Sequence, residues 1–600
     1  MFLLQSAALA PLSAWFYLVD RTVTEPYLVR SPTPRNEDEV FHVRQAQLYC
    51  AGNFHDWDPK ITTPPGLYIV SYLLSFSNWL NERFGFGFAL PLLGCNLAAL
   101  RLINVLGLAL LAALAYLSYQ TRSPYPRRER GLFQHSALNM VLFPPLFFFS
   151  ALYYTDIWST LSVVVFYVQM VNAHRSNMKA TERFVRLVTL GLVSLTFRQT
   201  NVFWVTVFPA AVTLVQHLDK GQEAVRSSMH RGVDGFGDSI YSVAKTAWKF
   251  EIIYDPPVEE SWIDGMSYAP THTQLAVLTA SHMTAYANCI VSIAACSLKT
   301  ISQPQRLLGL VLGLLPYLTL LGGFAGFVLW NGSVVLGDKG NHTATLHLPQ
   351  LLYLWPFMTF FSLPILYPHI LLVPITALAQ TRYAGHLESL QIFKRRRLLP
   401  RLWLLILLLG IAGVVVWANT IVHPFTLADN RHYVFYVFRL LLRPAWMRYA
   451  VIPIYILCAW ACIQALGGGP PHSHRSPTNL LPDGQHSVTC SFVIIWLATS
   501  ALQLITAPLV EPRYFILPWL FWRMHLPLRL PSRVENRRVS PKKEKDSSMV
   551  SIQALWHDYD HRLWLETVWL LAINGVTGYI FLNWGYEWPQ EPGKVQRFMW

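Results

Sequence analysis

Apolar blocks of about 20 residues recur along the whole chain, and this recurrence limits the possible fold more than any other feature of the sequence. A helix that crosses a bilayer needs about 20 mostly apolar residues. Hydrophobic residues make up 53% of the chain and charged residues only 13%, whereas soluble domains carry about 25% charged residues. The sequence therefore predicts an all-α polytopic membrane protein.

The apolar blocks predict about 13 membrane-spanning helices (about 12 to 14) in a single domain, residues 1–600. The first block carries Ala8-Leu9-Ala10, which resembles a cleavage site, so a removed signal peptide is the alternative to the retained helix that we favour. The expected spans are 2–19, 92–119, 136–152, 157–173, 184–198, 200–217, 306–330, 350–378, 401–421, 446–467, 488–508, 513–527 and 563–585.

The net charge of +14 is concentrated in short loops, at 127–130, 394–397 and 533–545. Cytoplasmic loops of membrane proteins carry such Lys and Arg clusters, so this distribution argues against binding of nucleic acid. The third cluster can also contact anionic lipid. The same rule predicts a cytosolic N-terminus.

The loops then divide between two faces. The cytosolic face receives a polar insertion, 218–268, and a basic loop, 527–562, while the ambiguous segment 269–297 is expected to lie at the interface. The lumenal face receives a first loop, 20–91, containing an interfacial helix at 66–80, and the loops 331–349 and 422–445. Two N-glycosylation sequons, at Asn331 and Asn341, agree with a lumenal position for the loop that holds them.

Seven cysteines lie mostly in apolar segments without a paired CxxC spacing. Their number is odd. Packing in the apolar core is the expected role, and the spacing indicates neither a disulfide framework nor a metal site.

Several ionisable residues are expected at lumenal helix ends, where charges near a membrane are costly and are functional candidates. Glu37, Asp38 and Glu39 form an acidic cluster just after the first apolar block. A carboxylate facing arginines suits transfer of a group from a lipid phosphate to a hydroxyl, because the carboxylate accepts the proton and the cations stabilise the leaving phosphate. The candidate phosphate ligands are Arg198, Arg431, His432 and Arg513.

Each candidate also has a structural explanation. Acids at 38 and 39 suit the start of a helix, and Arg198 suits an interfacial anchor. The segment 429–432 suits a turn, and Glu511 and Arg513 can simply pair with each other. No histidines have convincing metal-ligand spacing and no acidic pair requires Mg²⁺, so neither a metal nor another cofactor is expected.

Six motifs, taken together, closely resemble those of one family. They are Asp38-Glu39-Val40-Phe41-His42, the segment 58–68 (DPKITTPPGLY), Phe197-Arg198-Gln199-Thr200-Asn201, Gly337-Asp338-Lys339, the segment 427–433 (LADNRHY) and Glu511-Pro512-Arg513-Tyr514. The family comprises the endoplasmic-reticulum alpha-1,2-glucosyltransferases that use dolichyl phosphate glucose to add the last glucose to the lipid-linked N-glycan precursor. The resemblance extends to Trp600 and is weakest at 218–268 and 527–562.

The resemblance implies a GT-C glycosyltransferase fold in the endoplasmic-reticulum membrane, with the catalytic acid in the first lumenal loop. It implies an inverting reaction from dolichyl phosphate glucose to Glc2Man9GlcNAc2 diphosphodolichol. The product then passes to oligosaccharyltransferase. One departure is Glu37, where we expect an apolar residue, so the choice of base among Glu37, Asp38 and Glu39 stays open.

On these motifs, Asp38 is the expected base and Glu39 is expected to orient a sugar. The same four cations are the candidates for the donor phosphate, and the resemblance does not indicate which arginine contacts it. Further substrate contacts are expected from Glu37, His42, Trp57, Asp58, Thr62, Thr63, Asp156, Gln199, Asn201, Asp429, Asn430, Tyr433, Glu511 and Tyr514.

Three other functions remain as alternatives. The first is a GT-C transferase with a different polyprenyl-phosphate sugar, and the second is a lipid or sugar transporter. The third is an assembly factor that has lost activity. A transporter is expected to show internal repeats, and we find none in this sequence.

Overall fold

The fold was analysed in a computed structural model. It describes residues 2–24, 39–84, 94–122, 130–175, 178–231, 235–258, 282–340, 345–370, 402–421, 427, 430–467, 488–507, 509–528, 559–588, 591–598 and 600.

The N-terminal half is helical throughout its described part, as expected for a chain of apolar blocks. Its helices are α1 (Phe2–Thr22), α2 (Glu39–Cys50), α3 (Gly66–Phe84), α4 (Leu97–Arg122), α5 (Arg130–Val141), α6 (Pro144–Ser150), α7 (Asp156–Arg175), α8 (Ala180–Leu195), η1 (Gln199–Asn201), η2 (Phe203–Val207), α9 (Phe208–Leu218), α10 (Glu223–Arg231) and α11 (Ile240–Phe250).

The C-terminal half continues the bundle and ends in a short antiparallel hairpin that the sequence did not predict. Its elements are α14 (His282–Ile301), α15 (Pro304–Asn331), α16 (Gln350–Phe361), α19 (Leu402–Asn419), α21 (Tyr433–Leu442), α22 (Met447–Ala450), α23 (Ile452–Leu466), α24 (Cys490–Ile505), η4 (Pro512–Phe515), α25 (Ile516–His525), α28 (His561–Asn583), β1 (Gly585–Trp588) and β2 (Glu591–Arg597).

Five helices in the described part of the chain are long and apolar enough to cross a membrane, or up to seven if each of two bent pairs counts as one span. The bent pairs are Arg130–Val141 with Pro144–Ser150, at 67°, and Gln350–Phe361 with Leu363–Ile370, at 101°. The first bend coincides with Pro144 and Pro145, which have no backbone N–H for a continuous helix. A multi-pass membrane protein is thus confirmed, and the count of about 13 spans stays a prediction.

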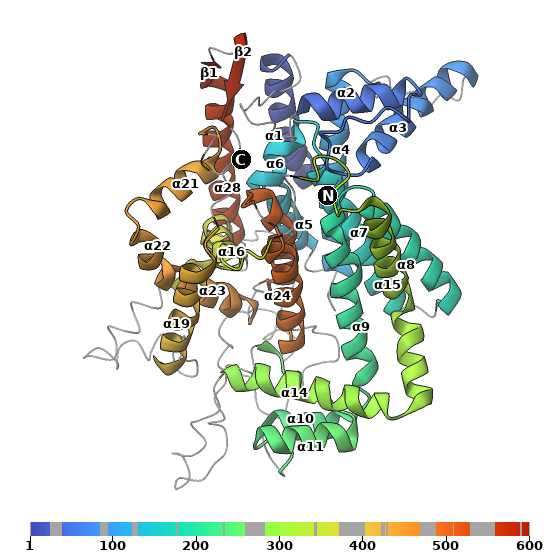
Figure 1. Cartoon of the computed structure of the whole chain (residues 1–600), viewed down its shortest axis with the longest axis vertical. Coiled ribbons are helices and arrows are strands. Elements are labelled where there is room, and N and C mark those ends of the chain that lie inside the picture. The colour runs from blue at the N-terminus through green and yellow to red at the C-terminus, as the bar shows by residue number, and fades with distance from the viewer. Residues whose placement is uncertain are drawn as a thin grey trace, which may run out of the picture.

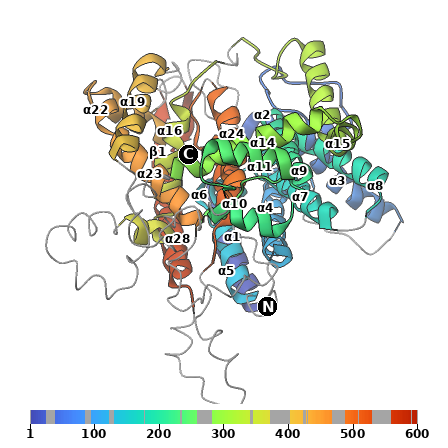
Figure 2. The same ribbon diagram turned by 90° about the horizontal axis from the view of Figure 1, so that it is seen from below.

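The helix α14 runs across the ends of α9, α15 and α24, and α10 and α11 pack beneath it (Figure 1, Figure 2). The interfacial position expected for 269–297 stays a prediction. Backbone hydrogen bonds anchor this part to the bundle, because Val258 N donates to Val488 O at 2.8 Å and Cys490 N donates to Pro256 O at 3.1 Å.

Cys50, at the end of α2, forms a disulfide with Cys95, just before α4. The expectation that no cysteines pair was therefore wrong for these two residues. The other five cysteines are free and buried, as expected. The bond ties the first polar loop to the start of a membrane helix.

Candidate functional site

The first residue of α2, Glu39, is completely buried in contact with Arg101 from α4. Arg101 Nε lies 2.8 Å from Glu39 Oε1, and Arg101 Nη2 lies 2.7 Å from Glu39 Oε2. The backbone N–H of Tyr153 also donates to Glu39 Oε1, at 2.9 Å. Both carboxylate oxygens are therefore engaged within the protein.

Arg101 also reaches the end of α1, since its Nη1 donates to Val23 O at 2.7 Å and lies 4.0 Å from Asp20 Oδ1. One turn further along α4, Asn104 donates to Leu152 O and Tyr154 O, at 2.6 and 2.9 Å. The start of α2 is thereby fixed against α1, α4 and the segment 152–154.

Two of the expected acids, Glu37 and Asp38, lie outside the described residues. Glu39, which follows Asp38 directly, has a buried ion pair where we expected a sugar contact. Both oxygens of Glu39 are bonded within the protein, and its expected contact with a sugar stays a prediction.

His42, one turn along α2, is buried among aromatic rings. Its Nδ1 lies 2.6 Å from Tyr68 Oη, and its ring centroid lies 5.7 Å from that of Tyr154. Burial, with a smaller contribution from the charge of Arg198, lowers the pKa of His42 from 6.5 to about 4. His42 is therefore a neutral hydrogen-bonding group near pH 7.

The loop 57–66 packs against α2 and the chain around residue 199. Gln45 accepts the N–H of Asp58 at 3.0 Å, and Gln199 donates to Thr62 O at 2.6 Å. Trp57 meets Tyr68 edge-on at 5.9 Å, and the Thr63 hydroxyl also lies beside Tyr68. Asp58 itself caps its own loop by accepting the N–H of Lys60.

At two glycines, the loop 57–66 and a neighbouring backbone segment lie too close together for a side chain to fit between them. Gly66 N donates to Thr196 O at 2.8 Å, and a Cβ on Gly66 would lie 2.7 Å from that same oxygen. A Cβ on Gly337 would lie 2.3 Å from Pro59 O. The Gly337-Asp338-Lys339 motif therefore packs directly on the loop 57–66, so that the loop after α15 lies at the same end of the bundle.

Asp156, at the start of α7, joins two of the expected arginines. Arg198 Nη1 lies 2.7 Å from Asp156 Oδ1, and Arg513 Nη1 lies 3.7 Å from Asp156 Oδ2. Arg513 also pairs with Glu511 at 2.9 Å. The Arg198 guanidinium lies 5.9 Å from the centre of the Tyr514 ring. We call Asp156, Arg198, Glu511, Arg513 and Tyr514 the arginine–carboxylate cluster.

The cluster is partly accessible, since the side chains of Arg198 and Arg513 are 14% and 9% exposed. Burial by itself lowers the pKa of Arg198, and the charge of Asp156 with those of Tyr514 and Glu511 outweighs it, so the pKa is raised. Both arginines are therefore permanently charged, and two carboxylates balance their charge.

The segment 153–156 connects the two parts of the site. Tyr153 bonds to Glu39, and Asp156, three residues later, pairs with Arg198. Tyr154 between them lies 5.9 Å from the guanidinium of Arg513. The expected convergence of the first loop, 153–156, 197–201 and 511–514 at one end of the bundle is confirmed.

Not every expected substrate contact is exposed to a ligand. Asn201 accepts a hydrogen bond from Ser159 Oγ at 3.0 Å and donates to Ser194 O at 3.0 Å, in a fully buried position. The side-chain amide of Gln199 donates a hydrogen bond to Thr62 O. These two residues hold the backbone around Arg198 in place.

Arg431, His432 and Tyr433 form a separate group at the start of α21. Arg431 is only 2% exposed, and His432 Nδ1 lies 3.4 Å from Trp600 O. The Tyr433 ring packs against Phe598 and Trp600 at 4.5 and 4.6 Å. Asn430 is exposed beside them, and Asp429 lies outside the described residues.

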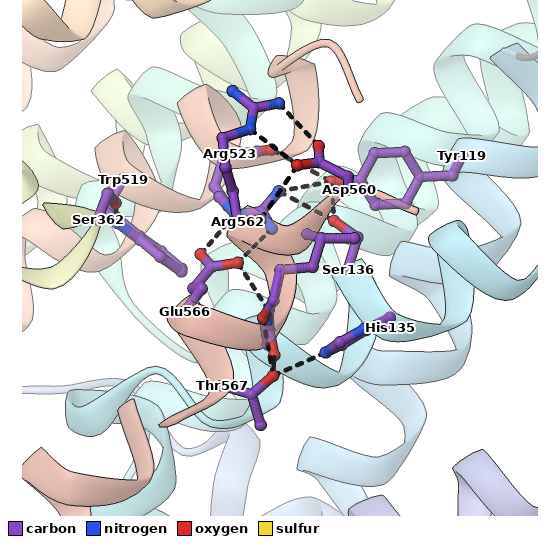
Figure 3. Close-up of polar contacts among 12 residues, drawn as sticks. Tyr119, His135, Ser136, Ser362, Trp519, Arg523, Asp560, Arg562, Glu566 and Thr567 are labelled. Atoms are coloured by element: carbon purple, nitrogen blue, oxygen red, sulfur yellow. Dashed lines mark hydrogen bonds and ion pairs between the residues drawn. The ribbon is translucent and has the colours of Figure 1, made fainter. Parts of the chain in front are cut away.

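A second buried ion pair, which the sequence did not point to, joins α25 and α28 (Figure 3). Arg523 Nη2 lies 2.7 Å from Glu566 Oε2, and both side chains are inaccessible. Tyr119, Ser136 and Asn139 complete the network from α4 and α5. Arg523 is ten positions beyond Arg513, on the far side of α25 from the arginine–carboxylate cluster.

No group of three or more His, Cys, Asp or Glu side chains is arranged to hold a metal ion in the part of the chain that the structure describes. The charges of the site are provided by arginines and carboxylates.

Residues 35–524 match the model of the DIE2/ALG10 family. The chain belongs to this family. It is 37% identical to a protein of Aspergillus fumigatus named Dol-P-Glc:Glc(2)Man(9)GlcNAc(2)-PP-Dol alpha-1,2-glucosyltransferase, over 98% of this chain and 96% of that protein. Proteins with the same name from Emericella nidulans and Mus musculus are 37% and 30% identical, over 98% of this chain and 96% and 95% of theirs.

An archaeal oligosaccharyltransferase from Archaeoglobus fulgidus, solved with dolichol-phosphate, matches at a TM-score of 0.24 and 12% identity, over 95% of this chain and 54% of that chain. That score is too low to assign a shared fold. Membership of the DIE2/ALG10 family instead rests on the sequence matches, which extend over the arginine–carboxylate cluster and the buried pair of Glu39 with Arg101.

Proposed function

We propose that this DIE2/ALG10 protein transfers glucose from dolichyl phosphate glucose to Glc2Man9GlcNAc2 diphosphodolichol, in alpha-1,2 linkage. The relatives named for this reaction cover nearly the whole chain. The observation that carries the proposal is the link between the acid-bearing start of α2 and the arginine–carboxylate cluster, through Tyr153 and Asp156.

In the proposed reaction, Asp38 takes the proton of the acceptor's 2-hydroxyl as that oxygen attacks C1 of glucose. The bond between C1 and the phosphate oxygen breaks, and its electron pair leaves with dolichyl phosphate, so a beta-linked donor gives an alpha product. The Glu39–Arg101 pair holds the segment that presents Asp38, because a general base has to lie within hydrogen-bond reach of the proton it accepts.

Arg198 and Arg513 are the proposed ligands of the donor phosphate. In the described contacts of Arg198, one terminal nitrogen is bonded to Asp156, and the guanidinium remains partly accessible. Arginine N–H groups stabilise charge that develops on a leaving phosphate. Asp156 and Glu511 fix the orientation of the two guanidinium groups beforehand, which avoids reorganisation during the reaction.

The proposal places the active site on the lumenal side of the endoplasmic-reticulum membrane, in a GT-C arrangement, with the product passed to oligosaccharyltransferase. The Cys50–Cys95 disulfide supports a lumenal first loop, because disulfides persist in oxidising compartments. No step of the proposed mechanism requires a metal or other cofactor.

The test is glucosyl transfer by the full chain in detergent, with dolichyl phosphate glucose and the diglucosylated acceptor. We expect Asp38→Asn to lose about a thousandfold or more of the wild-type rate. Arg198→Lys should raise the KM for the donor, since lysine lacks the paired donors of arginine. The matched control is Arg186→Lys, at a surface pair with Glu182 on α8, which should leave the kinetics unchanged.

Two results would overturn parts of the proposal. A nearly normal rate for Asp38→Asn would move the base to Glu37, because both carboxylate oxygens of Glu39 are bonded to Arg101. Folded wild-type protein that transfers glucose from no donor would reject the enzyme and favour the transporter.

A further inference from the structure

The segment 430–450 carries an excess of basic over acidic residues at the end of the bundle that holds Glu511 and Arg513. Between residues 402 and 467 the sequence has four arginines, one acid (Asp429) and no lysine. The arginines are Arg431, Arg439, Arg443 and Arg448. Such an excess is unusual on a face that we propose to be lumenal, because positive charge is normally retained in cytoplasmic loops.

Hydrogen bonds establish which end of the bundle this is. Asn419, at the end of α19, accepts the N–H of Leu348 at 2.6 Å, just before α16. Gln350, the first residue of α16, donates to Ala507 O and Leu509 O, at 2.5 and 3.0 Å. Those carbonyls lie just before Glu511, so the end of α19 and the start of α16 lie at the same end of the bundle as Glu511.

The helix α21 has the form of an interfacial helix. Val437 and Leu440 are 54% and 62% exposed, and Trp446, just beyond the helix, is 62% exposed. Arg439 and Arg443 are one helical turn apart and lie beside this apolar surface. Figure 1 shows α21 and α22 at the periphery of the bundle, and Figure 2 shows α22 next to α19. Exposed apolar side chains with adjacent arginines are typical of a helix that lies at the lipid headgroups.

The charges of this segment differ from those of the other lumenal arginines. Arg198 and Arg513 each pair with carboxylates. No salt bridge between described residues involves Arg439, Arg443 or Arg448, and Arg448 Nε is buried without a hydrogen-bond partner among them. A buried guanidinium nitrogen without a partner is costly, so this surface fits a ligand with several negative oxygens.

We propose that Arg439, Arg443 and Arg448 bind the diphosphate of the acceptor lipid. This inference rests on the proposed function, which requires two lipid substrates. The acceptor is extended at the glucose end of its glycan, remote from its diphosphate, so the diphosphate needs a site separate from that of the donor phosphate. A diphosphate carries more negative charge than a phosphodiester, which suits three arginines that form no salt bridge with another described residue, while the neutralised pair Arg198 and Arg513 suits the donor.

The packing supports a common framework for the two sites. From α21 to η4, ring contacts run from Tyr433 to Trp600 at 4.6 Å, then to Phe361 at 5.5 Å. Phe361 meets Phe357 at 4.8 Å, and Phe357 meets Phe515 at 4.9 Å. The two arginine groups are therefore held in a fixed relation by buried aromatic side chains. The exposed Leu440 and Trp446 offer an apolar surface beside the diphosphate for the polyprenyl chain.

The experiment compares the wild type with the triple variant Arg439→Gln, Arg443→Gln, Arg448→Gln in the transfer assay. Loss of charge-assisted hydrogen bonds should raise the KM for the acceptor about tenfold or more, with kcat and the donor KM unchanged. The double variant Arg439→Lys with Arg443→Lys keeps the positive charge, so its affinity for the acceptor should lie between those of the triple variant and the wild type. Arg186→Gln, at the exposed α8 pair, is the control and should behave as wild type.

A direct binding measurement distinguishes the source of the phosphate. Dolichyl diphosphate without sugar should bind wild type in neutral-lipid nanodiscs and bind the triple variant about tenfold more weakly. Equal binding of dolichyl diphosphate to both proteins would overturn the proposal, as would a raised donor KM. The proposal would also be overturned if wild-type activity required phosphatidylglycerol and the three arginines did not change the affinity for dolichyl diphosphate. The surface would then be assigned to anionic phospholipid.

These outcomes are separable from a failure of the proposed function. If the folded wild type transfers no glucose, the proposed function is rejected, while binding of dolichyl diphosphate still tests the arginine surface. If the wild type is active and the triple variant is folded with an unchanged acceptor KM, only the second site is rejected.

Discussion

Glu39 and Arg101 form an ion pair through both carboxylate oxygens, with neither side chain accessible to solvent. The two residues are 62 positions apart, on α2 and α4. Their contact holds the first residue of α2 in place, and the proposed base, Asp38, directly precedes it. The start of α2 therefore depends on a residue deep in the bundle.

Replacing Arg101 with Gln should reduce both stability and transfer. The change leaves the buried Glu39 carboxylate without its cation, and breaking a buried pair in this way costs about 3–5 kcal/mol. We expect the transfer rate to fall about a hundredfold, because a misplaced base loses its geometry. Rates measured below the unfolding temperature, together with thermal unfolding in detergent, check both expectations.

The double variant Arg101→Gln with Glu39→Gln shows whether the pair acts as a unit. Since the second change removes the uncompensated charge, its effect should be much less than additive, and part of the stability should return. Additive losses would mean that Glu39 has a further role in contact with substrate.

The lowered pKa of His42 predicts how the free energy of unfolding depends on pH. Its pKa is lowered to about 4 by burial and by Arg198, while an unfolded histidine has a pKa of about 6.5. Between these values the unfolded chain binds more protons, so the free energy of unfolding falls as the pH falls through this window. His42→Gln should flatten that dependence, as measured by thermal unfolding at about pH 7 and about pH 5.

His230 provides the matched control for His42. Its pKa is also lowered to about 4, by burial and by Arg226, and it lies on α10, remote from the site. His230→Gln should flatten the pH dependence of unfolding without changing the pH dependence of transfer. If the two variants have the same effect on transfer, then His42 has no local influence on the site.

The sequence predicted which segments share one end of the bundle better than it predicted the partners of single side chains. The order of apolar blocks brought 153–156, 197–201 and 511–514 to one end of the bundle, and the ion pairs of Asp156 confirm this. Arg101 lies inside an apolar block, where a single charge gives no indication of its partner. Its contact with Glu39 depends on how α2 packs on α4, which no local pattern encodes.

The cysteines show the same limit. All seven occur singly in the sequence, and nothing in their spacing separates Cys50 and Cys95 from the five that are buried and free. The two that pair lie on either side of α3 and are brought together by the fold of the first loop. The contacts of the Asn331 sequon are likewise not indicated by the sequence. The Asn331 side-chain amide donates to Ser333 O and Val335 O as part of the turn after α15.

Removing the Cys50–Cys95 disulfide should destabilise the first loop more than it lowers activity. A bond that closes a sequence separation of 45 residues stabilises by about 2–4 kcal/mol. Cys50→Ser with Cys95→Ser should lower the unfolding temperature, and transfer at low temperature should persist because Glu39 still anchors α2. Thermal unfolding and transfer on warming measure the two effects.

The comparison for the disulfide is Cys458→Ala with Cys462→Ala, which removes two buried free cysteines. That variant should keep the shift in gel mobility between reducing and non-reducing conditions, and the Cys50–Cys95 variant should lose it. Identical mobility of the wild type under both conditions would show that the two cysteines are not bonded in the protein.

The pair of Arg523 with Glu566, which joins α25 to α28 (Figure 3), tests stability apart from catalysis. Glu566→Gln leaves the Arg523 charge buried and should cost about 3–5 kcal/mol. Replacing both residues with Met should restore most of that loss, since a buried pair of similar volume is often replaced by apolar residues at little cost. Thermal unfolding of the single and double variants measures this directly.

The exposed pair of Arg186 and Glu182, with side chains 43% and 54% accessible, is the control for this comparison. Arg186→Gln should change stability by less than about 1 kcal/mol, because a solvated pair contributes little. The Met double variant, once folded, should transfer glucose at close to the wild-type rate. A folded double variant without activity would mean that Arg523 and Glu566 act on the site through α25, whose N-terminal end follows Arg513 and Tyr514, and would give this network a role beyond stability.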